Sequence, residues 1–210
     1  MTGDLVLASA NPKKAAELAR LLEGLSIRVL LPEEAGGLPA VVEDGETFAA
    51  NAAKKATSAA RASGRWALAD DSGLCVEALG GAPGVRSARY AGEPADDARN
   101  NAALLRALEG TADRRARFVC SLAVADPSGD VALRVEESVE GTILEAPRGR
   151  GGFGYDPLFF YPPLGRTFAE LPPAEKDAIS HRGRALRSLR SALEGRKGTG
   201  GRMGGARRPG

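Results

Sequence analysis

Short apolar runs alternate with amphipathic segments along the first part of the chain. Leu5–Ala8 is an apolar run of strand length, and Ile27–Leu31 is a second one. Between them, Leu18, Leu21 and Leu22 recur at the spacing of one helix face. The pattern therefore predicts a strand, a polar turn, a helix that stops near residue 24, and a second strand.

The next part of the chain passes from a loop into an alanine-rich helix. Residues 32–46 contain two Pro and three Gly and predict a loop. Thr47–Ser63 consists mainly of strong helix formers and is followed by Gly64, a stop signal. Trp66–Ala69 predicts a strand that leads directly into a turn at Asp70–Gly73.

The second half mixes strands and helices in the same way. The predicted elements are a helix at 96–108 stopped by Gly110, strands at 118–125 and 131–139 around a turn at 127–130, a glycine-rich loop at 149–157, and a helix at 180–193 with Ser180 as its N-cap. The hairpin requires antiparallel strands beside the helix-connected ones. The sequence therefore predicts an α/β protein with a mixed sheet.

Composition agrees with one globular domain. Apolar residues make up 43% of the 210 residues and charged residues 27%, which is enough apolar sequence for a core. The net charge of +2 comes from an arginine-rich end. Residues 195–210 are mostly Gly and Arg and predict a disordered tail after a domain at 1–194. Because the basic charge is not on the folded part, we expect no stable nucleic-acid partner.

Two cysteines, Cys75 and Cys120, are too few for a disulfide framework and lie in apolar surroundings. We expect buried, unreactive thiols in a reducing compartment. No apolar run approaches the roughly 20 residues that span a bilayer, and the start of the chain lacks the pattern of a secretory signal. These features predict a cytoplasmic protein without a membrane partner.

Two short segments could bind phosphate and metal. Ser9-Ala10-Asn11-Pro12-Lys13-Lys14 joins a strand to a helix start, where free backbone N–H groups and lysines favour a phosphate. The alternative is an ordinary helix cap. Asp70 and Asp71 follow a buried strand, and Mg²⁺ would balance two such carboxylates while sharing substrate phosphates. The alternative there is an acidic turn.

Two further segments could recognise a base. Gly149–Pro157 brings glycines together with Phe153 and Tyr155, whose rings could stack on a flat base. His181 and Arg182 adjoin a helix start, and His181 appears in a polar turn with no apolar face to bury it. Together with the phosphate and metal segments, these residues predict a purine nucleotide site.

The sequence also resembles a known family, the inosine-triphosphate or Ham1-like pyrophosphatases. The matching segments, in family order, are SANPKKAAEL at 9–18, ETFAANAAKKA at 46–56, LADDSGLCVEALGGAPGVRSARYAG at 68–92, GGFGYDPLF at 151–159 and EKDAISHRGRAL at 175–186. They span almost all of the chain except the tail. The resemblance implies an elongated, two-lobed molecule with an active-site cleft between the lobes, and a homodimer.

The resemblance also implies roles for individual residues. Asp71 matches the acid that binds metal and accepts a proton, Lys55 matches a catalytic lysine that holds the phosphates, and Ser72 matches a substrate contact. The remaining substrate contacts that it implies are Ser9, Ala10, Asn11, Pro12, Lys13 and Lys14 for the triphosphate, Phe153, Gly154, Tyr155 and Asp156 for the base, Lys176 for base or phosphate, and His181 and Arg182 for the 6-oxo edge of the purine.

Two positions depart from the family pattern. Relatives have Glu-Asn-Ala where this chain has Ala50-Asn51-Ala52. Val42 occupies one position aligned with an acid, which leaves Glu43, our choice, or Glu46 as the second Mg²⁺ ligand beside Asp71.

The function that follows is Mg²⁺-dependent hydrolysis of ITP, dITP and XTP to the monophosphate and pyrophosphate, which cleanses the nucleotide pool. One alternative is a Maf-like nucleotide pyrophosphatase, whose phosphate loop is similar. A second alternative, from another class, is a nucleic-acid-binding protein that uses the basic tail.

Overall fold

The computed structural model describes residues 3–9, 11–22 and 27–199. Within these ranges the strands form one seven-stranded sheet in the order β2-β1-β3-β4-β5-β6-β7. The strands are β1 (Gly3–Leu7), β2 (Ile27–Leu30), β3 (Trp66–Val76), β4 (Arg115–Ala125), β5 (Val131–Ile143), β6 (Phe159–Tyr161) and β7 (Arg166–Thr167). β1 pairs in parallel with β2 and β3, and the other pairs are antiparallel. The prediction of an α/β protein with a mixed sheet is confirmed.

Five α-helices and four short 3₁₀ helices lie in the described residues. The α-helices are α1 (Pro12–Leu21), α2 (Phe48–Ser63), α3 (Asp97–Ala107), α4 (Pro173–Ile179) and α5 (His181–Thr199). The 3₁₀ helices are η1 (Glu77–Leu79), η2 (Gly84–Arg89), η3 (Pro162–Leu164) and η4 (Phe168–Glu170). The pattern analysis did not predict α4, β6 or β7, because each is too short to show a clear period.

The helices cover the two faces of the sheet separately. Leu18 and Leu22 of the α1 region pack with Leu186 and Leu189 of α5 over one face, which we call the α5 face. The alanines of α2 pack over the other face, which we call the α2 face. Small alanine side chains allow α2 to lie close to the strands, and α2 accordingly contacts both β3 and β4 extensively.

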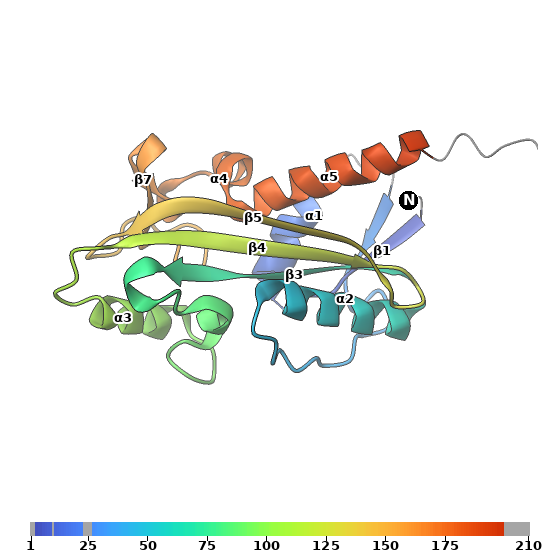
Figure 1. The fold of residues 1–210 in the computed structure, drawn as a ribbon, viewed down its shortest axis with the longest axis horizontal. Coiled ribbons are helices and arrows are strands. Elements are labelled where there is room, and N and C mark those ends of the chain that lie inside the picture. The colour runs from blue at the N-terminus through green and yellow to red at the C-terminus, as the bar shows by residue number, and fades with distance from the viewer. Residues whose placement is uncertain (1–2, 10, 23–26, 200–210) are drawn as a thin grey trace, which may run out of the picture.

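Three long strands connect the two ends of an elongated molecule. Figure 1 shows β3, β4 and β5 running along the long axis, with α3 near one end and β1 near the other. The end near α3 has its own core, in which Phe118 of β4 packs against Phe159 and Phe168 with ring centroids 4.5 and 5.9 Å apart. Since α1, α2 and α5 build separate cores at the other end, the molecule has two lobes joined by continuous strands.

Side-chain caps fix the helix starts. Asn11, Thr47 and Asp96 accept hydrogen bonds from the first turns of α1, α2 and α3. Gly64 ends α2 in the left-handed conformation with φ 62°, as predicted. Ser180 Oγ accepts from the Gly183 N–H at 3.1 Å, so the predicted cap of the last helix is confirmed.

The last helix is longer than its sequence pattern indicated. α5 runs to Thr199 instead of stopping at 193, so its end enters the segment predicted as a tail. Gly183 lies inside this helix against the carbonyl of Asp177, where any side chain would collide. Residues 200–210 of the predicted tail and the stop at Gly24 lie outside the described residues.

One prediction about β3 is wrong. The segment Asp70–Gly73 is not a turn, because β3 continues without interruption from Trp66 to Val76. Its pairing with β4 extends from Ala67 opposite Ala125 to Val76 opposite Ala116. The ladder to β4 therefore overrides the local turn chemistry of Asp-Ser-Gly.

Both cysteine thiols are free and buried, as expected. Burial raises the pKa of the Cys75 thiol and raises that of the Cys120 thiol well above its usual value. No helix in the described part of the chain is long and apolar enough to cross a membrane.

Candidate active site

The two adjacent carboxylates of β3 point to opposite faces of the sheet. Successive side chains of a strand alternate in direction, so Asp70 and Asp71 cannot share one small pocket. Asp71 contacts α2, whereas Asp70 contacts α1 and α5. The site must therefore be described as two half-sites, one on each face.

On the α2 face, Asp71 is surrounded by one cation and one amide. Lys55 Nζ lies 3.0 Å from Asp71 Oδ1, and Asn51 Nδ2 donates to Asp71 Oδ2 at 3.2 Å. Asn51 and Lys55 are four residues apart on α2 and therefore share one helix face. Burial raises the pKa of Asp71 despite the charges of Lys55 and, from the other face, Lys14, so this carboxylate holds a proton more readily than an ordinary aspartate.

Glu43 joins this half-site through the same lysine. Glu43 Oε2 lies 3.4 Å from Lys55 Nζ, so the ammonium sits between two carboxylates. Burial opposes the charge of Lys55, but Asp71 and Glu43 outweigh it and raise the lysine pKa. Glu46, the alternative acid, is exposed. Val42 is also largely exposed, at 72%.

No group of three or more His, Cys, Asp or Glu that could hold a metal occurs in the described residues. The α2 face thus offers two acids, Asp71 and Glu43, around one ammonium. A Mg²⁺ ion bound by one or two protein carboxylates takes its other ligands from water and substrate phosphates. This donor set fits such an ion and does not fit a closed structural metal site.

On the α5 face, Asp70 is fully enclosed by donors. Arg182 Nε and Lys14 Nζ contact its carboxylate at 3.0 and 2.9 Å. Ser72 Oγ donates to Oδ1 at 3.0 Å, and Cys120 Sγ donates to Oδ2 at 3.1 Å. Burial opposes ionisation, but the charges of Arg182 and Lys14 outweigh it and hold the pKa of Asp70 well below its usual range. Asp70 is therefore a permanent counter-ion.

Glu17 is a site residue that the sequence analysis missed. One of its oxygens accepts from Lys176 Nζ at 3.0 Å and the other accepts from Arg182 Nη1. Lys176 also contacts Asp156 Oδ2 at 2.6 Å. The signal available in the sequence was spacing, because Glu17 lies three residues after Lys14 and so on the same face of α1.

The glycine-rich loop presents one aromatic ring among cations. The Phe153 ring centroid lies 4.8 Å from Lys176 Nζ, 5.7 Å from the Arg182 guanidinium carbon and 5.9 Å from Lys13 Nζ. Such contacts are attractive because the ring face is negative. Tyr155 differs from the prediction, since its ring is packed in the core with 3% exposed and its hydroxyl donates to the Ser87 carbonyl. Of the two rings in this loop, Phe153 is therefore the better candidate to stack on a ligand.

The prediction of an exposed His181 is also wrong. The side chain is 4% exposed, and its ring stacks on Phe118 with centroids 4.7 Å apart and an interplanar angle of 11°. Burial and the charges of Arg182 and Lys176 hold the His181 pKa well below its usual value, so the ring is neutral. Its buried Nδ1 has no hydrogen-bond partner in the described part of the protein.

The segment predicted as a phosphate loop includes the N-cap of α1, which does not test its phosphate role. Asn11 Oδ1 accepts from the N–H groups of Lys13 and Lys14 at 3.0 and 3.2 Å, Ser9 Oγ donates to the Asn11 carbonyl, and Pro12 is the first helical residue. The two lysine side chains nevertheless reach Phe153 and Asp70. Ala10 lies outside the described residues.

The half-sites meet at a gap along the edge of β3. β1 pairs with β3 only as far as Leu68, where the Ala8 N–H donates to the Leu68 carbonyl. The edge is covered again at Leu74, whose N–H donates to Ser87 Oγ at 2.8 Å. Asp70 and Asp71 lie between these points. Between these points the described residues provide no backbone partner on this edge of β3, and the two buried carboxylates lie there on opposite faces.

One pocket gathers most of the predicted contacts on the α5 face. It is lined by Asn11, Lys14, Ser72, Gly73, Ser87, Ala88, Asp97, Phe118, Phe153, Gly154, Tyr155, Asp156, Lys176, His181 and Arg182. The catalytic candidates Asp71 and Lys55 and the metal candidate Glu43 are not part of this lining, because they lie on the α2 face. The structure brings base, phosphate and metal candidates together around β3 without placing them in one cavity.

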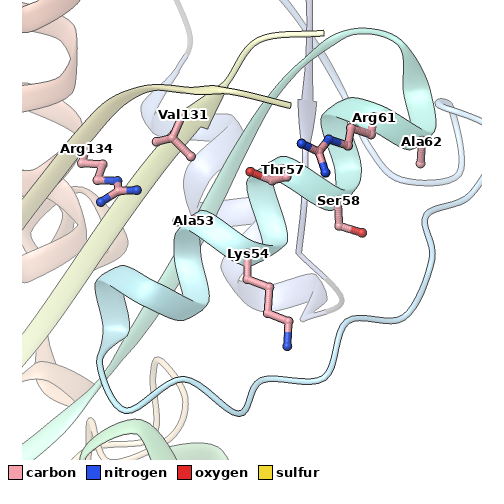
Figure 2. A pocket seen from close by; sticks show the side chains of 8 residues that line it. All are labelled: Ala53, Lys54, Thr57, Ser58, Arg61, Ala62, Val131 and Arg134. Carbon is pink, nitrogen blue, oxygen red and sulfur yellow. The ribbon is translucent and has the colours of Figure 1, made fainter. Parts of the chain in front are cut away.

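A second hollow lies apart from these residues. Figure 2 shows it between the outer side of α2 and the start of β5. It is lined by Ala53, Lys54, Thr57, Ser58, Arg61, Ala62, Val131 and Arg134. None of these is a predicted site residue, and the lining contains no acid. The hollow therefore does not belong to the candidate site.

This chain is similar to known proteins over most of its length. A sequence model of the Ham1 family matches residues 5–192. The chain belongs to the Ham1 family. A protein from Syntrophobacter fumaroxidans is 57% identical over 190 residues, covering 90% of this chain and 82% of that protein. One from Aromatoleum aromaticum is 55% identical over 194 residues, covering 92% and 98%. Both are named dITP/XTP pyrophosphatase.

Solved Ham1 structures share this fold. A Ham1 protein from Coxiella burnetii superposes with a TM-score of 0.85 at 47% identity, covering 93% of this chain and all of that one. The Staphylococcus aureus Ham1 protein gives 0.83 at 40% identity, covering 92% and 99%. A Mycobacterium abscessus structure described as a nucleoside-triphosphatase and dITP/XTP pyrophosphatase gives 0.73 at 44% identity, covering 89% and 98%. The seven-stranded sheet and its helices are thus the Ham1 fold.

Proposed function

We propose that this chain hydrolyses ITP, dITP and XTP to the monophosphate and pyrophosphate, with Mg²⁺ as cofactor. The observation that carries the proposal is the pair of half-sites around Asp70 and Asp71 of β3. Asp71, Lys55 and Glu43 form a charged cluster on one face. Phe153, Arg182 and Lys176 form a cationic aromatic pocket on the other. The names of the Ham1 relatives support the same substrate class.

The chemistry on the α2 face is assigned to Asp71. Its raised pKa suits a group that orients an attacking water and accepts a proton from it. Lys55 lies beside it and would neutralise negative charge on the phosphates as pyrophosphate leaves. A bound Mg²⁺, held by Asp71 and Glu43, would supply further charge neutralisation.

Base selection is assigned to the α5 face. Phe153 offers a stacking surface, and Arg182 is a permanent donor, because its guanidinium remains charged beside Asp70 and Glu17. Three of its five N–H groups are used by Asp70, Glu17 and Ser72. A donor at the purine 6-position favours the 6-oxo group of hypoxanthine and xanthine, whereas the amino group of adenine leaves donors unpaired.

The testing experiment is a panel of nucleoside triphosphates assayed with Mg²⁺ and with excess EDTA, with products identified. We expect ITP, dITP and XTP to exceed ATP in kcat/KM by roughly 10⁴, to give monophosphate and pyrophosphate, and to require the metal. Equal rates for ITP and ATP would overturn the assignment of Arg182. A preference for pyrimidine triphosphates would instead favour the Maf-like activity, and full activity in EDTA would exclude the metal site.

The proposal also covers assembly and compartment. We propose a cytoplasmic homodimer, as the Ham1 resemblance implies. The two free, buried thiols are compatible with a reducing compartment. Light scattering on the purified protein measures the assembly, and a monomer at micromolar concentration would contradict it. Salt-sensitive binding of DNA or RNA that is lost with residues 200–210 would favour the nucleic-acid alternative.

A further inference from the structure

The start of α3 lies against the base-stacking loop and binds one residue of it twice. Asp97 Oδ2 accepts a hydrogen bond from the Gly154 N–H at 2.9 Å. Asn101 Nδ2 donates to the Gly154 carbonyl at 2.8 Å. Asp97 and Asn101 are four residues apart, so both side chains come from the same face of α3. The helix thus holds both backbone polar groups of the residue next to Phe153.

The backbone of Phe153 is also held on its other side. Its own N–H donates to Asp156 Oδ2 at 2.9 Å, and the same oxygen contacts Lys176 at 2.6 Å. The two N–H groups that flank the Phe153 Cα therefore each donate to a different carboxylate. Gly154 adopts the left-handed conformation with φ 61°, which directs its N–H and carbonyl to α3. These anchors fix the direction of the Phe153 Cα–Cβ bond, from which the ring extends.

This double anchoring matters because the loop is rich in glycine. Gly149, Gly151, Gly152 and Gly154 give residues 149–154 large conformational freedom in the absence of such bonds. Asn101 is itself restrained, since its Nδ2 also donates to the Asp97 carbonyl at 2.8 Å. Asp97 additionally attracts Lys13 Nζ at 3.7 Å, but both side chains are about half exposed, so this pair contributes little.

We propose that Asp97 and Asn101 are positioning residues that hold Phe153 in the orientation needed to stack on the purine base. The inference rests on the proposed function, because it assigns them a part in binding its substrate. Asn101 acts through the backbone beside Phe153, whereas Asp97 in addition lines the pocket on the α5 face itself. Since Asp71 lies on the α2 face, loss of the Asp97 and Asn101 hydrogen bonds to Gly154 changes KM and leaves kcat nearly unchanged.

The test is a double-mutant cycle with ITP as substrate. Asn101→Ala and Asp97→Ala are each made in the parent chain and in Phe153→Ala, and kcat and KM are measured separately. In the parent, each is expected to raise KM about three- to tenfold, the scale of one lost hydrogen bond, with kcat within about twofold. In Phe153→Ala, Asn101→Ala should have no further effect on KM, and Asp97→Ala should have a smaller effect than in the parent, because Asp97 also lines the pocket.

A conservative variant and a matched control complete the test. Asp97→Asn keeps an oxygen that can accept from Gly154, so its KM should return to within about twofold of the parent. Asn100→Ala removes the neighbouring asparagine of α3, which binds the backbone of Ala88 and Ala91 and not the loop. Any effect of Asn100→Ala should persist unchanged in Phe153→Ala. Melting temperatures of all variants identify changes that come from the fold.

The outcomes separate the inference from the proposed function. If the parent hydrolyses ITP but Asn101→Ala acts equally with and without Phe153, the positioning role is wrong and the function stands. A fall in kcat at constant KM would also overturn the positioning role. If the parent hydrolyses no nucleoside triphosphate, the proposed function fails and the inference fails with it.

Discussion

Asp70 and Asp71 are neighbours in sequence, yet their surroundings on the two faces of the sheet shift their pKa values in opposite directions. Asp70 meets Arg182, Lys14, Ser72 and Cys120 and is held ionised. Asp71 meets Lys55 and Asn51, and burial shifts its pKa upward. The same residue type is thus a structural counter-ion on one face and a candidate proton acceptor on the other. Environments that move two carboxyl pKa values apart are typical of acid–base sites.

Of the substitutions that test this comparison, Asp70→Asn is expected to have the largest effect on the free energy of unfolding. The substitution leaves the buried Arg182, which is 1% exposed, without its carboxylate. Removing one partner of a buried ion pair costs about 3–5 kcal/mol of unfolding free energy. Urea unfolding monitored by circular dichroism measures the loss. A change below about 1 kcal/mol would mean that Glu17 alone balances Arg182.

Asp71→Asn should do the reverse, with a large loss of activity and a smaller loss of stability than Asp70→Asn. Burial disfavours the charge of Asp71, and Glu43 still pairs with Lys55, but the amide nitrogen must face a donor, Lys55 or Asn51. We expect kcat for ITP to fall by roughly 10²-fold or more, the scale for an acid–base group. Single-turnover kinetics and the urea midpoint check the two parts. Activity within a few-fold of the parent would remove Asp71 from the chemistry.

The α5 face should also impose a pH dependence on stability through His181, the one histidine of the chain. Its pKa in the folded protein lies well below 6.5, so below pH 6.5 the unfolded chain takes up a proton that the folded chain does not. Unfolding free energy should then fall as pH drops, by up to about 1.4 kcal/mol per pH unit, until the folded pKa is reached.

Urea unfolding between pH 7.5 and 5.5 measures this slope. His181→Gln is the control, because it removes the titrating ring and should flatten the curve in that range. An equal slope in parent and His181→Gln would show that other groups cause it.

The smallest expected effect concerns Cys120, whose thiol donates to Asp70. Cys120→Ser keeps a donor at this position, so we expect a change in unfolding free energy within about 1 kcal/mol. The raised pKa of the thiol also predicts no reaction with maleimide in the folded protein. Rapid native-state labelling of Cys120, followed by mass spectrometry, would contradict its burial.

Local signals predicted the parts of the fold that depend on nearby residues. The cap Ser180 and the stop at Gly64 act within one helix turn, and the structure has both. The continuation of β3 through Asp70–Gly73 was not predictable in this way. It depends on pairing with β4, about fifty residues further along the chain. Local turn chemistry and distant pairing disagreed, and the pairing decided the structure.

The same distinction explains which site residues could be predicted. The motifs that carry Asp71, Phe153 and Arg182 were visible as sequence, and the structure places all three around β3. The partners of these motifs were not visible, because Glu17 looks like one more polar position of an amphipathic helix. The burial of His181 likewise depends on Phe118, a residue of a different element. Charge balance inside a core is a property of the assembled fold.

The gap at the edge of β3 has a consequence for how this enzyme family can diversify. Pairing between β1 and β3 ends at Leu68, and beyond it α2 builds one side of β3 while α1 with α5 builds the other. Under the proposed function, changes in the choice of base require substitutions only on the α5 face. The residues proposed for bond breaking, on α2 and β3, can then stay unchanged. New substrates would be acquired without rebuilding the catalytic side.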